Sequence, residues 1–128
     1  MRISTWNINS VRLRLQQVLR FIKDKRIDVL CLQETKTPDE NFPSQDFSNI
    51  GMKYQYYRGE KSYNGVAILS NVKLKDENFI NLCGKNDTRH ISVKLNKTTE
   101  LHNFYIPAGG DDPDIYKNPK FEHKISFL

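Results

Sequence analysis

The chain has 128 residues, the size of one domain, and 38% of them are apolar, which is enough for a core and excludes a largely disordered chain. Its 20 lysine and arginine residues exceed its 15 acidic residues, and the net charge of +5 suits a polyanion such as nucleic acid, although scattered positive residues also fit an ordinary basic protein. No run of about 18 apolar residues and no leader pattern occurs, so we expect neither membrane insertion nor secretion.

The first part of the chain predicts a strand, a helix and a second strand. Residues 2–8 are β-prone, and an apolar stripe with helical spacing follows from Leu15 to Ile22. The apolar run at 29–32 suits a strand covered on both faces, as parallel strands are. Residues 2–34 are therefore predicted to form a strand, helix, strand unit with parallel strands.

The middle of the chain predicts a short helix and two strands. Residues 46–50 have the character of a short helix, and Gly51 is well placed to end it. Residues 54–58 and 65–69 predict strands, the second of them buried, with a polar loop at 59–64 between them.

A hairpin is predicted in the second half. The connection 71–88 is polar, and its few apolar residues predict one short strand around 79–82. Residues 89–95 and 101–106 flank Asn96-Lys97-Thr98-Thr99 with the spacing of a hairpin, so this half is expected to be an antiparallel meander.

The last predicted element is a helix. Asn118 is a suitable capping residue and Pro119 suits a first turn, but the chain stops at Leu128 without a cap, so we expect an incomplete domain. The two cysteines, Cys31 and Cys83, have neither disulfide nor metal-ligand spacing. They are expected to be free thiols in a cytoplasmic protein.

Two polar side chains stand at the ends of the first two predicted strands. Asn7 ends the first strand and Glu34 follows the second, and parallel strands end at the same edge of a sheet. Neighbouring strands are about 4.8 Å apart, so the amide oxygen and the carboxylate can converge on one ion. Such oxygen donors favour Mg²⁺, with Mn²⁺ possible. The spacing alone equally fits a turn residue and an exposed carboxylate.

Four segments resemble, in order, motifs of the exonuclease III and apurinic-apyrimidinic endonuclease family, within the endonuclease/exonuclease/phosphatase superfamily. They are TWNINSVR at 5–12, LQETK at 32–36, YNGVAIL at 63–69 and NFYIP at 103–107. The resemblance implies that residues 1–128 are the amino-terminal part of a single domain of this superfamily. It implies a deoxyribonuclease I-like four-layer α/β sandwich, about half of which is present, so that one sheet would lack its facing partner.

The resemblance also implies roles for three side chains. Glu34 would ligate Mg²⁺ directly, and Asn7 would help to hold the catalytic carboxylate or the phosphate. Tyr105 would hydrogen-bond the scissile phosphate or the nucleophile. These roles agree with the chemistry, since phosphodiester hydrolysis needs neutralised phosphate oxygens, an activated water and a supported leaving group.

DNA contacts are expected from positive side chains and from a glycine pair. Arg89 resembles a family arginine that contacts the DNA backbone. At the position of Ala108 the family often carries an amide, so either the N–H groups of Gly109 and Gly110 replace that contact or the contact is absent. Three lysines would add phosphate contacts, although each taken alone is more typical of a solvated surface charge: Lys36, Lys61 and Lys124.

Other family features have no counterpart here. The three histidines, which we expect to be structural or surface residues, do not resemble the catalytic histidine: His90, His102 and His123. The Gly-Asp-x-Asn and Ser-Asp-His motifs are missing, and residues 110–113 are no substitute. The residues that activate water would belong to those motifs, so this chain alone is expected to be a poor nuclease.

Three functions stay open at this point. The chain is half of an abasic endonuclease with 3′ exonuclease action, a truncated product with residual DNA or metal binding, or another phosphoesterase acting on a lipid or inositol phosphate. The opening motif and the Tyr-Ile-Pro motif favour the first. The expected partner is double-stranded DNA with abasic sites or 3′ ends, bound by a monomer.

Overall fold

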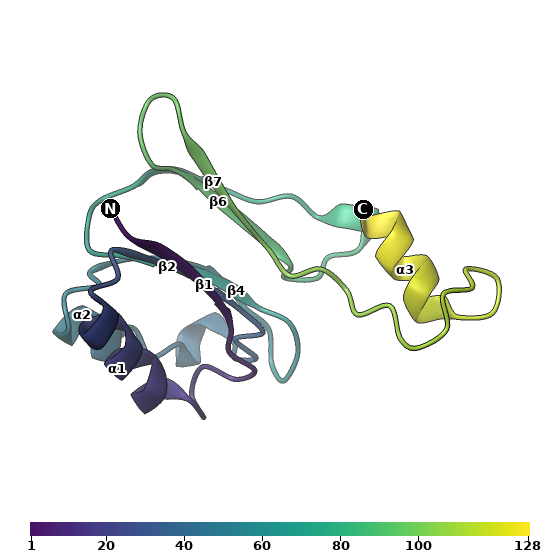
Figure 1. Ribbon diagram of the computed structural model, residues 1–128, viewed down its shortest axis with the longest axis horizontal. Helices are drawn as coiled ribbons and strands as arrows, with labels where there is room; N and C mark the ends of the chain where they lie inside the picture. The colour runs from purple at the N-terminus through teal and green to yellow at the C-terminus, as the bar shows by residue number, and fades with distance from the viewer.

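Two β-sheets packed face to face form the centre of the computed structural model, which describes residues 1–128 (Figure 1). Sheet A has the order β1-β2-β4-β3, and sheet B has the order β5-β6-β7. The strands of sheet A are β1 (Ile3–Asn7), β2 (Val29–Gln33), β3 (Tyr54–Arg58) and β4 (Val66–Ser70). Those of sheet B are β5 (Lys75–Asn78), β6 (His90–Lys94) and β7 (Glu100–Phe104).

Helices cover the outer face of sheet A and one end of sheet B (Figure 1). The α-helices are α1 (Leu15–Lys25), α2 (Ser44–Asn49) and α3 (Pro119–Phe127), and two 3₁₀ turns are η1 (Asp39–Asn41) and η2 (Leu82–Gly84). None of these helices has the length and apolar character needed to span a membrane. The helix, sheet, sheet layers of the expected sandwich are thus present, with α3 at the end of sheet B.

The predicted strand, helix, strand unit is confirmed. β1 and β2 are parallel neighbours, with Asn7 opposite Gln33. Val18 and Ile22 of α1 are buried, because the apolar stripe of this helix faces the sheet. The unit brings the end of β1 beside the end of β2.

Sheet A is mixed rather than parallel throughout. β4 is antiparallel to both β2 and β3, and all five of its residues are buried. β4 is covered by helices on one face and by sheet B on the other. Its apolar run therefore indicates burial on both faces and does not indicate whether the neighbouring strands are parallel or antiparallel.

The alternation of side chains along β2 divides the core in two. Leu30 and Leu32 point into the layer between sheet A and the helices, together with Phe47 of α2. Val29 and Cys31 point the other way, into the layer between the two sheets. One strand thus ties the helical layer to sheet B.

The expectation that one sheet would lack its facing partner is wrong for the centre of the sandwich. Val66 and Ile68 of β4 pack with Ile91 and Val93 of β6 in one buried cluster. The expectation holds only at the side where β1 and β7 are the edge strands, since Ile3 remains 43% exposed.

The strand predicted around 79–82 lies elsewhere. β5 occupies Lys75–Asn78, whereas Phe79 and Ile80 are 51% and 49% exposed and Leu82 begins η2. Every residue of β5 is exposed because this edge strand has no buried face, so no apolar alternation marks it.

The remaining elements agree with the predictions. β6 and β7 form an antiparallel hairpin, in which Ile91 and Val93 are buried. α2 ends before Gly51, whose φ of +96° is open to glycine at low cost. Asn118 caps α3 by accepting a hydrogen bond from the Lys120 N–H at 3.0 Å.

Candidate metal and phosphate site

The ends of β1 and β2 bring two predicted site residues into contact. Asn7 Nδ2 donates a hydrogen bond to Glu34 Oε1 at 2.9 Å. The parallel pairing of the two strands causes this contact, because it places Asn7 opposite Gln33 and so beside the next residue. The amide uses its nitrogen for this bond, which leaves Oδ1 available for a ligand, and the role of this pair in holding a metal stays a prediction.

The backbone that presents Glu34 is strained. Glu34 has φ of +54° and Lys36 has φ of +53°, a left-handed conformation that costs a non-glycine residue about 1 kcal/mol or more. Buried Thr35 between them donates its N–H to Gly65 O at 3.2 Å, and Lys36 donates its N–H to Asn64 O at 2.9 Å. These bonds hold the strained turn in place.

Gly65 is required by that same turn. Its φ is +93°, and a Cβ atom there would lie 2.0 Å from Thr35 Oγ1. A larger residue would therefore displace the segment that carries Glu34. This explains in physical terms why a glycine follows Asn64 immediately before β4.

Lys36 lies in the site as a partner of Glu34. Its Nζ is 3.3 Å from Glu34 Oε2, and it also donates to Asn9 Oδ1 at 2.6 Å. The ammonium group of Lys36 thus lies close to the Glu34 carboxylate, where it would compete with a bound metal ion. Its expected phosphate contact stays a prediction, and this ion pair would have to loosen to allow it.

The pKa of Glu34 is lowered by the balance of opposing effects. Burial raises this pKa, but hydrogen bonds from Asn7, Tyr105 and Lys36 and the positive charge of Lys36 together outweigh burial. The carboxylate is therefore ionised at neutral pH, the form that binds a divalent cation.

The side chain of Tyr105, which comes from the sheet B side, interacts with the Glu34 carboxylate. Tyr105 follows β7, and its N–H donates to Arg89 O at 2.7 Å, which continues the pairing of β7 with β6. Burial raises the pKa of Tyr105, and the negative charge of Glu34 raises it further, while Arg89 acts in the opposite direction. The phenol stays protonated at neutral pH and can donate a hydrogen bond.

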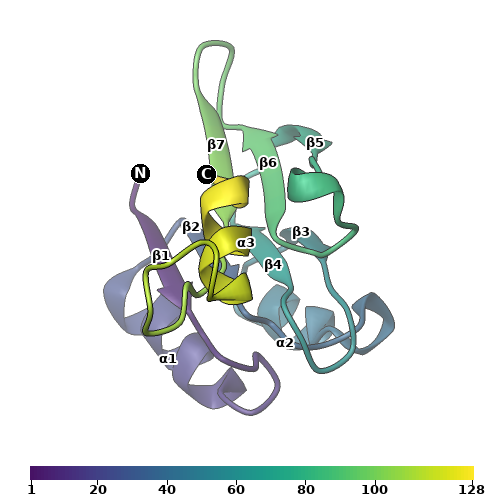
Figure 2. The ribbon, with the colours of Figure 1, turned by 90° about the vertical axis from the view of Figure 1, so that its right-hand side faces the viewer.

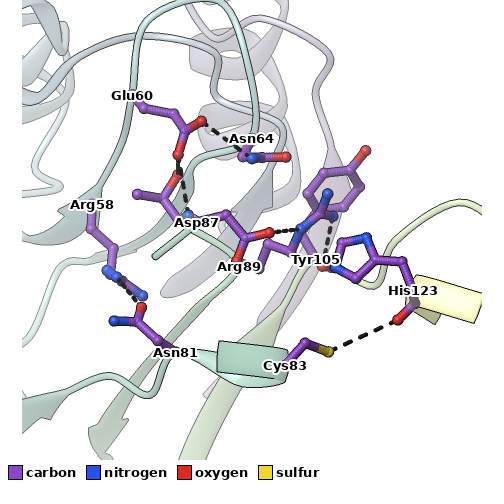
Figure 3. A network of polar contacts seen from close by, with 10 residues as sticks. Arg58, Glu60, Asn64, Asn81, Cys83, Asp87, Arg89, Tyr105 and His123 are labelled. Atoms are coloured by element: carbon purple, nitrogen blue, oxygen red, sulfur yellow. Dashed lines mark hydrogen bonds and ion pairs between the residues drawn. The ribbon is translucent and has the colours of Figure 1, made fainter. Parts of the chain in front are cut away.

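The guanidinium group of Arg89 lies against the ring of Tyr105, within a polar network (Figure 3). Its guanidinium carbon is 4.7 Å from the centre of the Tyr105 ring, and its Nε is 2.6 Å from Asp87 Oδ2. Asp87 fixes this arginine at a partly buried position, a contact that no motif indicated. The expected DNA contact of Arg89 stays a prediction.

His123 belongs to this network, although only a structural or surface role was predicted for it. Its ring lies beside Arg89 (Figure 3), and its Nε2 is buried without a hydrogen-bond partner. Burial lowers the pKa of His123, and the positive charges of Lys85 and Arg89 lower it further. The ring is therefore neutral at pH 7.

The other two histidines lie on the outer face of sheet B, away from Glu34. Ile80 N–H donates to His90 Nδ1 at 3.0 Å, and His90 Nε2 is 3.0 Å from His102 Nδ1. His102 in turn contacts Glu100 at 3.2 Å. This chain of contacts agrees with the structural role expected for both.

Asn103 holds the two sheets together beneath the site. It is 3% exposed, and its Nδ2 donates to the carbonyls of Leu32 and Ala67 in sheet A, each at 2.9 Å. Its Oδ1 accepts from Gln33 Nε2 at 2.7 Å. Asn103 stands two residues before Tyr105, and Gln33 one residue before Glu34. The sequence placed Asn103 in a motif without indicating this function.

The remaining predicted contacts do not touch the Asn7 and Glu34 pair. Lys61 is exposed in the loop before β4. Gly109 packs against α3, where a Cβ would lie 3.0 Å from Lys124 Cδ, and its carbonyl accepts from Asn118 at 2.9 Å. No hydrogen bond uses the N–H groups of Gly109 and Gly110. Their binding to phosphate stays a prediction.

The donor set suits Mg²⁺ with few protein ligands. No group of three or more His, Cys, Asp or Glu side chains is arranged to hold a metal ion. Mg²⁺, however, commonly keeps several waters and uses one or two carboxylates together with substrate phosphates. Ionised Glu34 with Oδ1 of Asn7 therefore fits this ion and does not fit a closed structural site.

Comparisons with known proteins agree with this geometry. The sequence matches the Endonuclease/Exonuclease/phosphatase family over residues 4–123. It is 37% identical to exodeoxyribonuclease III of Haemophilus influenzae over 70 residues, which are 55% of this chain and 26% of that protein.

Solved structures cover nearly the whole chain. The 3′ phosphatase NExo from Neisseria, bound to a product DNA hairpin, is similar over 99% of this chain and 48% of its own, with 32% identity and a TM-score of 0.87. An AP endonuclease from Archaeoglobus fulgidus is similar over 98% and 47%, with 35% identity and a TM-score of 0.83. The chain thus spans about half the length of these structures and has the corresponding part of their fold. It belongs to the Endonuclease/Exonuclease/phosphatase family, and the similar proteins named here are an exodeoxyribonuclease, a 3′ phosphatase and an AP endonuclease.

Proposed function

We propose that this chain carries the amino-terminal half of the active site of a Mg²⁺-dependent DNA-repair nuclease. Its reaction is phosphodiester hydrolysis at abasic sites and at the 3′ ends of double-stranded DNA. The observation that carries the proposal is the contact of Asn7 with ionised Glu34, beside the phenol of Tyr105. Relatives named as DNA nucleases and a similar structure bound to DNA support the substrate class.

Glu34 and Asn7 are the residues proposed to hold the ion. Glu34 supplies the carboxylate, and Asn7 orients that carboxylate through Nδ2 and offers Oδ1 as a further donor. When bound, Mg²⁺ (or Mn²⁺) would neutralise charge on the phosphate and support the leaving oxygen. Lys36 would then exchange its ion pair with Glu34 for a phosphate oxygen.

Tyr105 and Arg89 are proposed to orient the phosphate. The raised pKa of Tyr105 keeps its proton available for donation to a phosphate oxygen or to the nucleophile. Arg89, whose direction is set by Asp87, would contact the DNA backbone. The further phosphate contacts proposed come from Lys61, Lys124 and the N–H groups of Gly109 and Gly110.

No side chain beside Glu34 is suited to deprotonate water. Glu34 is a weak base because its pKa is lowered, Tyr105 is protonated, and Lys36 is a cation. General-base assistance is worth about 10² to 10⁴ in rate. We therefore propose that the 128-residue chain alone does not incise abasic DNA. We also propose that the protein is a monomer and that it is located in the cytoplasm, where free thiols persist.

The test compares this chain with a version extended through the Gly-Asp-x-Asn and Ser-Asp-His motifs of the family. Substrates are a duplex with one abasic site, a duplex with a 3′ phosphate and an inositol phosphate, each with Mg²⁺, Mn²⁺ or chelator. We expect chelator-sensitive activity on DNA from the extended chain only, and its loss in Glu34→Gln. Hydrolysis of the inositol phosphate alone would refute the DNA assignment. Cleavage by the short chain that disappears in Glu34→Ala would refute its proposed inactivity.

A further inference from the structure

A second charged hollow lies at the turn end of sheet B. It has a volume of about 410 Å³, and the start of β5, the end of β6 and the turn after β6 contribute its lining. Its charged residues are Lys73, Lys75, Asp76, Lys94 and Lys97. None of them belongs to the four family motifs, and the proposed hydrolysis requires none of them.

The charges of this hollow are unbalanced. Asp76 Oδ2 lies 3.2 Å from Lys94 Nζ, and this is the only ion pair among the lining residues. The ammonium groups of Lys73, Lys75 and Lys97 have no acidic partner, so the hollow keeps three uncompensated positive charges. An anion that enters would relieve their mutual repulsion.

The strand register adds to this repulsion. Lys75 and Lys94 are direct cross-strand partners and so share one face of sheet B. Like charges directly opposite each other destabilise an antiparallel pair. On its other side Lys94 faces Glu100, but Glu100 contacts His102 at 3.2 Å. The fold therefore places two lysines opposite each other, and Asp76 pairs with Lys94 but leaves Lys75 without an acidic partner.

The hollow is separate from the Asn7 and Glu34 site. Arg89 precedes β6 at the site, whereas Lys94 ends β6 at the hollow, and the five-residue strand spans about 14 Å. Figures 1 and 2 show the β6–β7 turn projecting from the end of sheet B opposite α3. One backbone phosphate cannot contact both places.

We propose that this hollow binds the phosphates of a nucleic-acid backbone, as a contact additional to the strand held at the active site. Lysine ammonium groups recognise phosphate as point charges without reading bases. The amide oxygen of Asn96 is already used by the N–H and hydroxyl of Thr98, at 2.9 and 3.0 Å. Because the lysines supply the charge of the hollow, the contact is directed to the backbone, and it serves to retain the protein on intact duplex. It goes beyond the proposed hydrolysis and does not depend on it.

The test uses the whole chain and a 12-base-pair duplex without an abasic site as probe. Amide NMR shifts are followed during titration, with inorganic phosphate at the same phosphate concentration as a second arm. The test variant is Lys73→Gln/Lys75→Gln/Lys97→Gln. The control, Lys23→Gln/Lys25→Gln/Lys53→Gln, removes the same charge elsewhere, and circular dichroism checks that both fold.

We expect duplex-dependent shifts at residues 73–76 and 94–97 that inorganic phosphate does not reproduce. Losing three phosphate contacts should reduce the slope of log affinity against log salt by about 2.7, which is about 40-fold less loss of affinity between 50 and 200 mM salt. The control should change the slope by less than one contact. Shifts confined to the Glu34 site, equal effects of the two variants, or saturation by inorganic phosphate alone would each overturn the proposal. The wild-type titration decides the matter even if a variant does not fold.

Discussion

Replacing Asn103 with alanine tests whether the amide between the sheets stabilises the fold. The substitution removes two hydrogen bonds to sheet A carbonyls at 2.9 Å and one from Gln33 at 2.7 Å. Each such bond is worth about 1 kcal/mol net, so we expect a loss of about 3 kcal/mol in unfolding free energy. For a chain of this size that corresponds to a fall in melting temperature of about 12 °C.

Two matched variants separate hydrogen bonding from packing. Asn103→Leu fills the same space without the amide and should lose a similar amount. Gln33→Ala removes the bond to Asn103 Oδ1 together with one to Thr5 Oγ1 at 2.9 Å, so about 1 to 2 kcal/mol is expected. In a double-mutant cycle the two substitutions should be coupled by about 1 kcal/mol.

Urea unfolding followed by circular dichroism gives these free energies, provided that the slopes remain equal. Full stability in Asn103→Leu would show that the site is a matter of packing. Strict additivity of Asn103→Ala and Gln33→Ala would show that their contact contributes nothing. Either result would refute the reasoning.

Three further predictions concern charge. Lys36→Met removes the ammonium that competes for Glu34, so calorimetry should give about two- to fivefold tighter Mg²⁺ binding, and weaker binding would contradict this. Asn7→Ala removes a hydrogen bond that lowers the pKa of Glu34, so carboxyl NMR should show that pKa rising. The stability linked to Glu34 is lost as pH falls from 4.5 through the lower folded pKa, and the substitution should reduce that loss, whereas an unchanged titration would contradict the assignment. Burial lowers the pKa of His90, so the folded state disfavours its protonation and stability should fall as pH drops below 6.5. His90→Asn, which keeps an acceptor for the Ile80 N–H, should flatten this dependence by up to about 1.4 kcal/mol per pH unit, and an unchanged slope in pH-dependent melts would exclude His90 as the cause.

The sequence was sufficient for the elements whose residues repeat with a regular period. The apolar run of β2 reflects its burial on both faces, and the alternation of apolar residues in β6 reflects the face that packs on sheet A, so both strands were predictable. The contact of Asn7 with Glu34 was also predictable, because parallel pairing alone brings the strand ends together. β5 was not, since an exposed edge strand has no pattern to detect.

The parts of the site that the sequence did not reveal depend on contacts between distant residues. Asn103 bonds to Leu32 across 71 positions, and no local pattern records that the two sheets meet there. His123 approaches Arg89 only because α3 lies at the end of sheet B. Asp87 is close to Arg89 in sequence, but its contact requires the particular bend of the chain before β6.

The position of Cys31 between the sheets makes it a natural reporter of their separation. Burial raises the pKa of this thiol to about 11, and only 4% of the residue is exposed, so an alkylating reagent cannot reach a thiolate while the sheets stay packed. Cys83 is half-buried near the surface and supplies an internal reference within the same molecule. The ratio of the two labelling rates therefore measures how often the sandwich opens, without any engineered probe. Nucleic acid that stabilises the packing of the two sheets would slow the labelling of Cys31, so the labelling rate would also report nucleic-acid binding.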